Sequence, residues 1–184
     1  MKKEVKTFNS SIQYVTYYRN VKYPRLEFRT GMLNLILPHN YEEEDKLLKT
    51  HKNWIIKKQK SINSALNKSK ERKLMRRDLE VLKKIVLDYY EQNSHKFKAK
   101  KIQFRNMKSK WGSCSSDKTL TFNSFLRFLP LSLIQYVVYH EMVHLKERKH
   151  SKVFWGNVSK KFKNYQSKEK DLFIYWFLVQ ERIK

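Results

Sequence analysis

Residues 140–144 read HEMVH, a pattern in which two histidines stand four positions apart with a glutamate beside the first. On an α-helix successive residues advance by about 100°, so His140 and His144 share one face, one turn or about 5–6 Å apart. Their imidazoles can therefore bind one metal ion. The carboxylate of Glu141 can then take a proton from a metal-bound water. The pattern predicts a hydrolytic centre with one zinc ion per chain and Glu141 as general base.

A catalytic zinc site needs three protein ligands and an open fourth position. His150 is the favoured third ligand because it follows His144 by six residues. In a straight helix His150 would lie about 9 Å further along the axis and could not reach the ion. The helix is therefore expected to stop near residues 146–149 and fold back, although no glycine is present in this corner, where metzincin sites have one. Glu169 and Asp171 are the alternative third ligands.

The remaining histidines and the one cysteine are interpreted as residues outside the metal centre. His39, His51 and His95 have no partner at ligand spacing and are expected at the surface. Cys114 as a fourth ligand would close the site and make it structural, so a small buried residue in a tight loop is the favoured role. A single cysteine excludes an intramolecular disulfide, which agrees with a reducing compartment.

The composition is strongly basic, with 41 Lys and Arg against 17 Asp and Glu in 184 residues and a net charge of +24. Such a charge can bind nucleic acid, but it is spread along the chain, so a solvated surface is the favoured interpretation. The first 15 residues lack the apolar core of a signal peptide. The longest apolar run, residues 172–179, is shorter than the roughly 20 residues of a membrane span. A cytoplasmic protein without membrane contact is expected.

Apolar periodicity predicts an α+β chain that positions these residues. Strands 25–29 and 33–37 alternate in polarity around a turn at Thr30 and Gly31, which indicates a small antiparallel sheet. The other predicted elements are strands 101–105 and 119–122 and helices 41–64, 75–89, 131–146, one beginning at Ser151, and a final one that contains residues 172–179. We expect an N-terminal extension of sheet plus helix, residues 1–66, and a hydrolase domain, residues 67–184, in one compact unit.

Five blocks in fixed order surround the histidines: residues 110–115 (KWGSCS), 121–126 (TFNSFL), Pro130, 136–145 (YVVYHEMVHL) and 150–155 (HSKVFW). With these blocks the chain resembles the YgjP-like metallopeptidases, small relatives of the zincins that are also related to the SprT and Wss proteases. The resemblance extends over most of the chain. One position departs from the family pattern, because Lys149 stands where a small residue or Asn is common.

The resemblance implies a zincin-like domain with its HExxH helix against a small, mostly antiparallel sheet. It also implies zinc bound by His140, His144 and His150, with Glu141 as the catalytic base. Residues 111–113, namely Trp111, Gly112 and Ser113, would then lie beside the cleft, where an edge strand can bind an extended peptide by β-augmentation.

We therefore expect a zinc-dependent metallopeptidase that hydrolyses peptide bonds in a peptide or protein substrate. Tyr139, Tyr165 and the backbone of residues 111–115 are the candidate donors for the oxyanion. One alternative is a metal-dependent nucleotide (UTP-type) pyrophosphatase, although no Gly-rich phosphate loop is visible. The other is a basic nucleic-acid-binding module or DNA-associated protease, whose binding would weaken steeply with salt.

Overall fold

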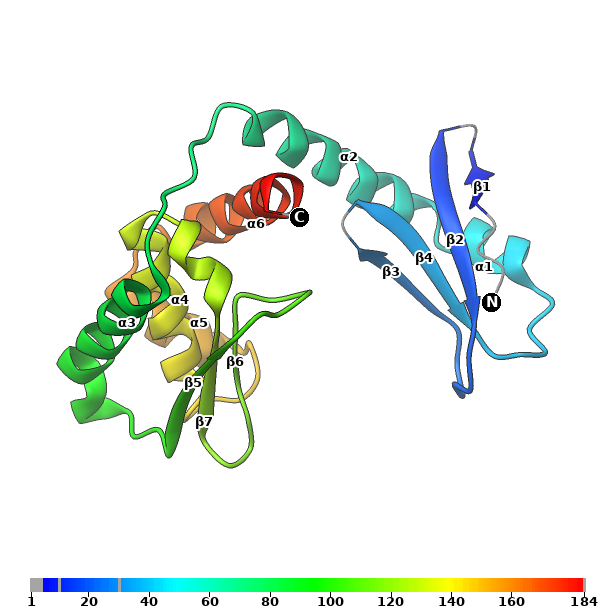
Figure 1. Ribbon diagram of the computed structural model, residues 1–184. Coiled ribbons are helices and arrows are strands. Elements are labelled where there is room, and N and C mark those ends of the chain that lie inside the picture. Colours follow the sequence, from blue (N-terminus) through cyan, green and yellow to red (C-terminus); the bar gives the residue numbers. More distant parts are fainter. Residues whose placement is uncertain (1–4, 10, 30, 184) are drawn as a thin grey trace. The chain divides into compact units, whose positions relative to one another are not determined.

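The computed structural model describes residues 5–9, 11–29 and 31–183 and shows an α+β chain (Figure 1). The chain divides into two compact units, Met1–Glu71 and Arg72–Lys184, and each has a hydrophobic core of its own. The domain division expected after residue 66, with both parts in one compact unit, stays a prediction. None of the helices in the described ranges combines the length and apolar character that crossing a membrane requires.

The N-terminal unit is a four-stranded sheet with two helices. Its strand order is β1-β2-β4-β3, in which the two outer pairs are antiparallel and the central pair is parallel. The sheet is therefore mixed and not antiparallel as predicted, because the hairpin of β3 and β4 places β4 next to β2. The elements are β1 (Val5–Phe8), β2 (Ile12–Tyr18), β3 (Arg25–Arg29), β4 (Met32–Leu37), α1 (Glu44–Thr50) and α2 (Lys52–Ser69).

One sequence prediction for this unit, the hairpin, is confirmed, and another, the single helix over 41–64, is not. The hairpin is present as β3 and β4; of its predicted turn, Thr30 lies outside the described residues, and Gly31 has a φ of 88°, which suits glycine. The single helix predicted over 41–64 is wrong, because His51 has non-helical dihedrals (φ −99°, ψ 11°) and separates α1 from α2. Leu48 and Ile55 are buried in one cluster despite this break, so the apolar periodicity continued across it.

The C-terminal unit is a three-stranded sheet covered by helices. The central strand β7 pairs in parallel with β5 and antiparallel with the edge strand β6, so this sheet is also mixed and not mostly antiparallel. The parallel pairing arises because β6 lies between β5 and β7 in the sequence but at the far edge in space. The elements are α3 (Leu79–Asn93), η1 (Ser94–Lys96), β5 (Lys101–Arg105), β6 (Gly112–Cys114), β7 (Thr119–Asn123), η2 (Ser124–Phe128), α4 (Leu131–Val143), α5 (Lys152–Lys161) and α6 (Tyr165–Arg182).

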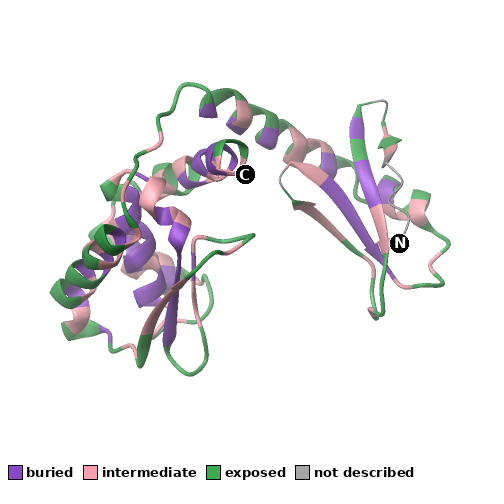
Figure 2. Ribbon diagram, viewed as in Figure 1, coloured by how far each residue is buried: buried purple, intermediate pink, exposed green. Residues whose placement is uncertain are grey.

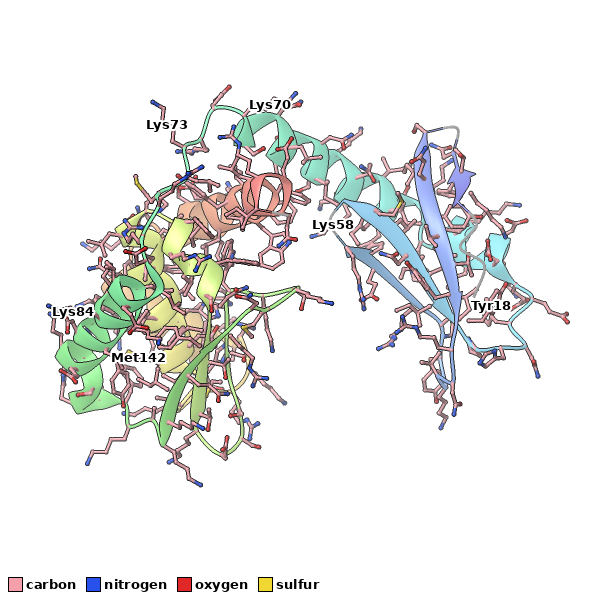
Figure 3. All side chains as sticks on the ribbon, in the orientation of Figure 1. Tyr18, Lys58, Lys70, Lys73, Lys84 and Met142 are labelled. Carbon is pink, nitrogen blue, oxygen red and sulfur yellow. The ribbon has the colours of Figure 1, made fainter. Side chains whose placement is uncertain are left out.

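Helix α4 is the centre of this unit, and most of its length is buried (Figure 2). It packs against α3, α5, α6, β6 and β7. Met142 of this helix, labelled in Figure 3, is fully buried, as are Ile134 and Val138. Because other elements pack against it on several sides, α4 can hold polar side chains at fixed positions in an apolar environment.

One helix prediction in this unit needs correction, and another is confirmed. Met75 was expected on the buried stripe of a helix, but α3 begins only at Leu79, and Met75 is 43% exposed. The extended backbone of Asp78 ends the preceding segment, in which the N–H of Met75 bonds to the Phe128 carbonyl. The predicted last helix is confirmed as α6, which contains residues 172–179 and extends beyond this apolar run on both sides.

Candidate metal centre

Three histidines from the end of α4 and the start of α5 meet at one point. His140 lies on α4, His144 directly follows its last residue, and His150 comes two residues before α5. One ring nitrogen from each lies within 4.8 Å of the others, and the two Nε2 atoms of His140 and His150 are 3.0 Å apart. Among the described residues, Glu169 and Asp171 do not belong to this group. The three histidines can hold a metal ion.

The protonation of the rings fits metal binding. Burial, followed by the neighbouring His144 and His150, lowers the pKa of His140 to about 3. Burial also lowers the pKa of His144, although its bond to the Glu147 backbone acts in the opposite direction. Both imidazoles are therefore neutral at neutral pH, which is the form that coordinates transition metals.

The corner after α4 is a tight turn that needs no glycine. The N–H groups of Lys146 and Glu147 both bond to the Val143 carbonyl, at 3.1 and 2.9 Å. The described residues with positive φ are Asn9, Gly31 and Lys118, all outside this corner. The helix ends at Val143, a few residues before the predicted stop, because this turn closes directly behind His144.

Neighbouring groups orient two of the three rings. The Nδ1–H of His144 donates to the Glu147 carbonyl at 3.0 Å, which leaves Nε2 free to bind a metal. The exposed ring of His150 stacks on Trp155 at 5.4 Å and 22°, and Trp155 stacks in turn on Tyr165 at 4.9 Å and 19°. Ser151 begins α5 as predicted, since its hydroxyl accepts from the next turn of the helix.

Glu141 is buried beside the histidines. Burial is the largest cause that raises its pKa to about 8; Glu169 adds to the shift, and Lys110 opposes it. A cation held by the histidines would favour the carboxylate form again, because opposite charges attract more strongly in a buried environment. Glu141 is therefore a carboxyl group whose proton affinity is high and sensitive to its neighbours, as a general base requires.

A cavity of about 500 Å³ opens over these residues. Residues 110–114 form one wall, and this wall includes the three predicted substrate-binding residues, Trp111, Gly112 and Ser113. Tyr136, Arg148 and Glu169 also line the cavity, although the sequence had assigned no function to Tyr136 or Arg148. The spacing of Tyr136, four residues before His140 on the same helix, was a signal that could have identified it.

The other candidates from the sequence lie elsewhere or have different contacts. Tyr139 packs against Phe97 and Phe162, and Tyr165 against Trp155, so neither tyrosine lines the cavity. His39, His51 and His95 do not belong to any metal-binding group of the described residues.

Cys114 lines the cavity without belonging to the metal-binding group of the described residues. Burial is the largest cause that raises the pKa of its thiol, and Glu141 adds to the shift. The thiol form is therefore favoured, which argues against a nucleophilic role.

Side-chain bonds attach the wall of residues 110–114 to the core, in addition to the pairing of β6 with β7. The fully buried Asn123 donates from Nδ2 to the carbonyls of Met107 and Lys110, at 2.9 and 2.8 Å. The indole N–H of Trp111 donates to the Leu172 carbonyl at 3.2 Å, and its ring meets Trp176 edge to face. These bonds connect the wall to β7 and to α6.

Gly112 provides the space that the Glu141 side chain occupies. A Cβ at this position would lie 2.7 Å from Glu141 Cγ, whereas a Cβ at Gly156 on α5 would meet nothing within 4 Å. We expect Gly112→Ala to destabilise the metal-free protein by about 1–3 kcal/mol through overpacking. Gly156→Ala should stabilise it by about 0.5–1 kcal/mol, since alanine favours a helix interior. Urea unfolding of both variants measures the difference, and equal stabilities would contradict the close packing.

Part of the chain is similar to known proteins. The model of the YgjP-like metallopeptidase domain matches residues 71–173. No curated protein sequence is significantly similar to the chain. Two solved structures are similar over 56% of this chain. The metallopeptidase zymogen of Methanocaldococcus jannaschii jannalysin is 25% identical, with all of that chain covered and a TM-score of 0.43. The metallopeptidase zymogen of Pyrococcus abyssi abylysin is 20% identical, with 96% covered and a TM-score of 0.41.

Proposed function

Because the chain belongs to the YgjP-like metallopeptidase family, we propose that it is a zinc-dependent peptidase that hydrolyses peptide bonds through an activated water. One observation carries the proposal: three imidazoles and a buried carboxyl group line the same cavity. This combination would provide the ligands and the base of metal-assisted hydrolysis.

In the proposed mechanism His140, His144 and His150 hold the ion. When bound, zinc supplies Lewis acidity and lowers the pKa of water to about 7. Glu141 accepts a proton from the attacking water and passes it to the departing amine. The apolar surroundings of Glu141 strengthen these charge interactions because little water is present to screen them.

The substrate is proposed to be a peptide or protein that binds in an extended conformation. In the sheet of the described residues, β6 pairs only with β7, and its residues line the cavity next to Glu141. An extended chain can add to such an edge through backbone hydrogen bonds. Trp111, Gly112 and Ser113 would then contact the substrate, and the bonds from Asn123 and Trp111 would keep this wall in place.

Metal removal tests the proposed function. Elemental analysis of the purified protein should find about one zinc per chain, as a site with three histidine ligands predicts. A chelator should abolish casein cleavage, and added zinc should restore it. Cleavage that continues without metal would contradict the proposal. Hydrolysis of UTP without cleavage of any peptide would replace it with the nucleotide alternative.

A further inference from the structure

The two ring nitrogens of His140 have different surroundings. Its Nε2 faces Nε2 of His150 and so belongs to the metal-binding group. Its Nδ1 points away, is buried, and has no hydrogen-bond partner. His144 in contrast donates its Nδ1–H to a carbonyl at 3.0 Å. A buried polar atom without a hydrogen-bond partner is costly, so Nδ1 of His140 indicates an interaction that forms under another condition.

The carboxylate of Glu169 is in position to become that acceptor. Its Oε1 lies 3.7 Å from Nδ1 of His140, which is within ion-pair range but too long for a hydrogen bond. In the described part of the chain, no other carboxylate forms an ion pair with a ring nitrogen of His140. Glu169 comes from α6, so it reaches the site from a different helix than its target.

Tyr136 holds this carboxylate in place. Its hydroxyl donates to the same Oε1 of Glu169 at 2.5 Å, and its ring meets the His140 ring edge to face at 6.0 Å. Tyr136 is only 1% exposed, and burial together with the bond to Glu169 raises the pKa of its hydroxyl, so it remains a donor. The side chain of Glu169 is 43% exposed, and this bond restricts its freedom at the surface.

We propose that Glu169 is a positioning residue that accepts a hydrogen bond from Nδ1–H of His140 when Nε2 binds the metal, with Tyr136 orienting the carboxylate. Binding at Nε2 fixes the proton on Nδ1 and makes the ring more positive, so the attraction to Glu169 increases. A shift of about 1 Å brings the two atoms to hydrogen-bond distance. This role rests on the proposed metal site and does not depend on which bond the enzyme cleaves.

Zinc affinity tests the role without using activity. We expect Glu169→Ala to weaken zinc binding by about 10–100-fold, the usual effect of losing an outer partner of a ligand histidine. Glu169→Gln, which keeps an acceptor oxygen without the charge, should fall between this variant and the wild type. Tyr136→Phe should also weaken binding, by less than Glu169→Ala. The Kd for zinc is measured by competition with a chromophoric chelator.

Asp171→Asn is the matched control. Asp171 is a carboxylate on the same helix that pairs with Arg72 at 2.8 Å, and it should keep the wild-type Kd. Thermal unfolding in chelator should be similar for Glu169→Ala and the control, which separates positioning from folding. A wild-type Kd in Glu169→Ala would overturn the proposal. If the zinc Kd values change as expected but the wild type cleaves no peptide, only the proposed function is contradicted. A wild-type protein that binds no zinc would contradict both proposals.

Discussion

Replacing Glu141 with glutamine should leave zinc bound and reduce the kcat of peptide cleavage by about 100-fold to 10,000-fold. Glutamine has nearly the same shape and fits the space left by Gly112, but its amide cannot accept the proton of the attacking water. The three histidines are unchanged, so the metal content should match the wild type. Initial rates with a fluorogenic peptide and elemental analysis of the same sample measure the two quantities together.

Glu147→Gln is the control for this variant. Glu147 is a neighbouring glutamate that contacts His144 through its backbone carbonyl and does not line the cavity. Its replacement should change kcat by less than about two-fold, because the substitution keeps the backbone carbonyl and alters only a side chain that does not line the cavity. Wild-type turnover in Glu141→Gln would remove Glu141 from the mechanism. Loss of zinc in that variant would indicate that Glu141 supports the site and not the proton transfer.

Replacing His150 with alanine should have the largest effect on metal binding. The ring comes from the corner behind α4, and its Nε2 lies 3.0 Å from that of His140. Two histidines alone leave a zinc site with too few protein ligands. We therefore expect His150→Ala to weaken zinc binding by more than about 100-fold, the upper limit for losing a residue that hydrogen-bonds to a ligand histidine. Peptide cleavage should be undetectable at sub-stoichiometric zinc.

His95→Ala serves as the control, because His95 lies in η1 outside the group of three. It should keep both zinc affinity and activity. If His150→Ala bound zinc like the wild type, the third ligand would have to be another residue. A much larger loss in Glu169→Ala than in His150→Ala would then identify Glu169, one of the two alternatives from the sequence.

Local patterns in the sequence were sufficient to predict the elements that carry the chemistry. The apolar residues around residues 140–144 predicted the helix α4, and the four-residue spacing of two histidines placed them on one face. The sequence also predicted the start of α5 at Ser151 and the strand over residues 101–105. These features depend on neighbours within one or two turns, so periodicity and capping residues contain the information.

Helix limits were less predictable, because an apolar stripe reports burial and not backbone conformation. Met75 fitted the stripe of α3 without belonging to the helix, and the periodicity of α1 and α2 continued across the break at His51. The run over residues 172–179 marked only the buried part of α6. In each case packing against a shared core produced the pattern on which the prediction was based.

By itself, the sequence predicted a helix that carries two histidines and a glutamate. Its resemblance to a known family implied a metal site there. The sequence favoured His150 behind a turn, but only the tertiary structure brought its ring beside His140, Gly112 against Glu141, and Glu169 opposite His140. Both mixed sheets likewise depend on which strands become neighbours in space. The physical reason is that contacts between separate elements arise from mutual packing of surfaces, and no period in the chain encodes that packing.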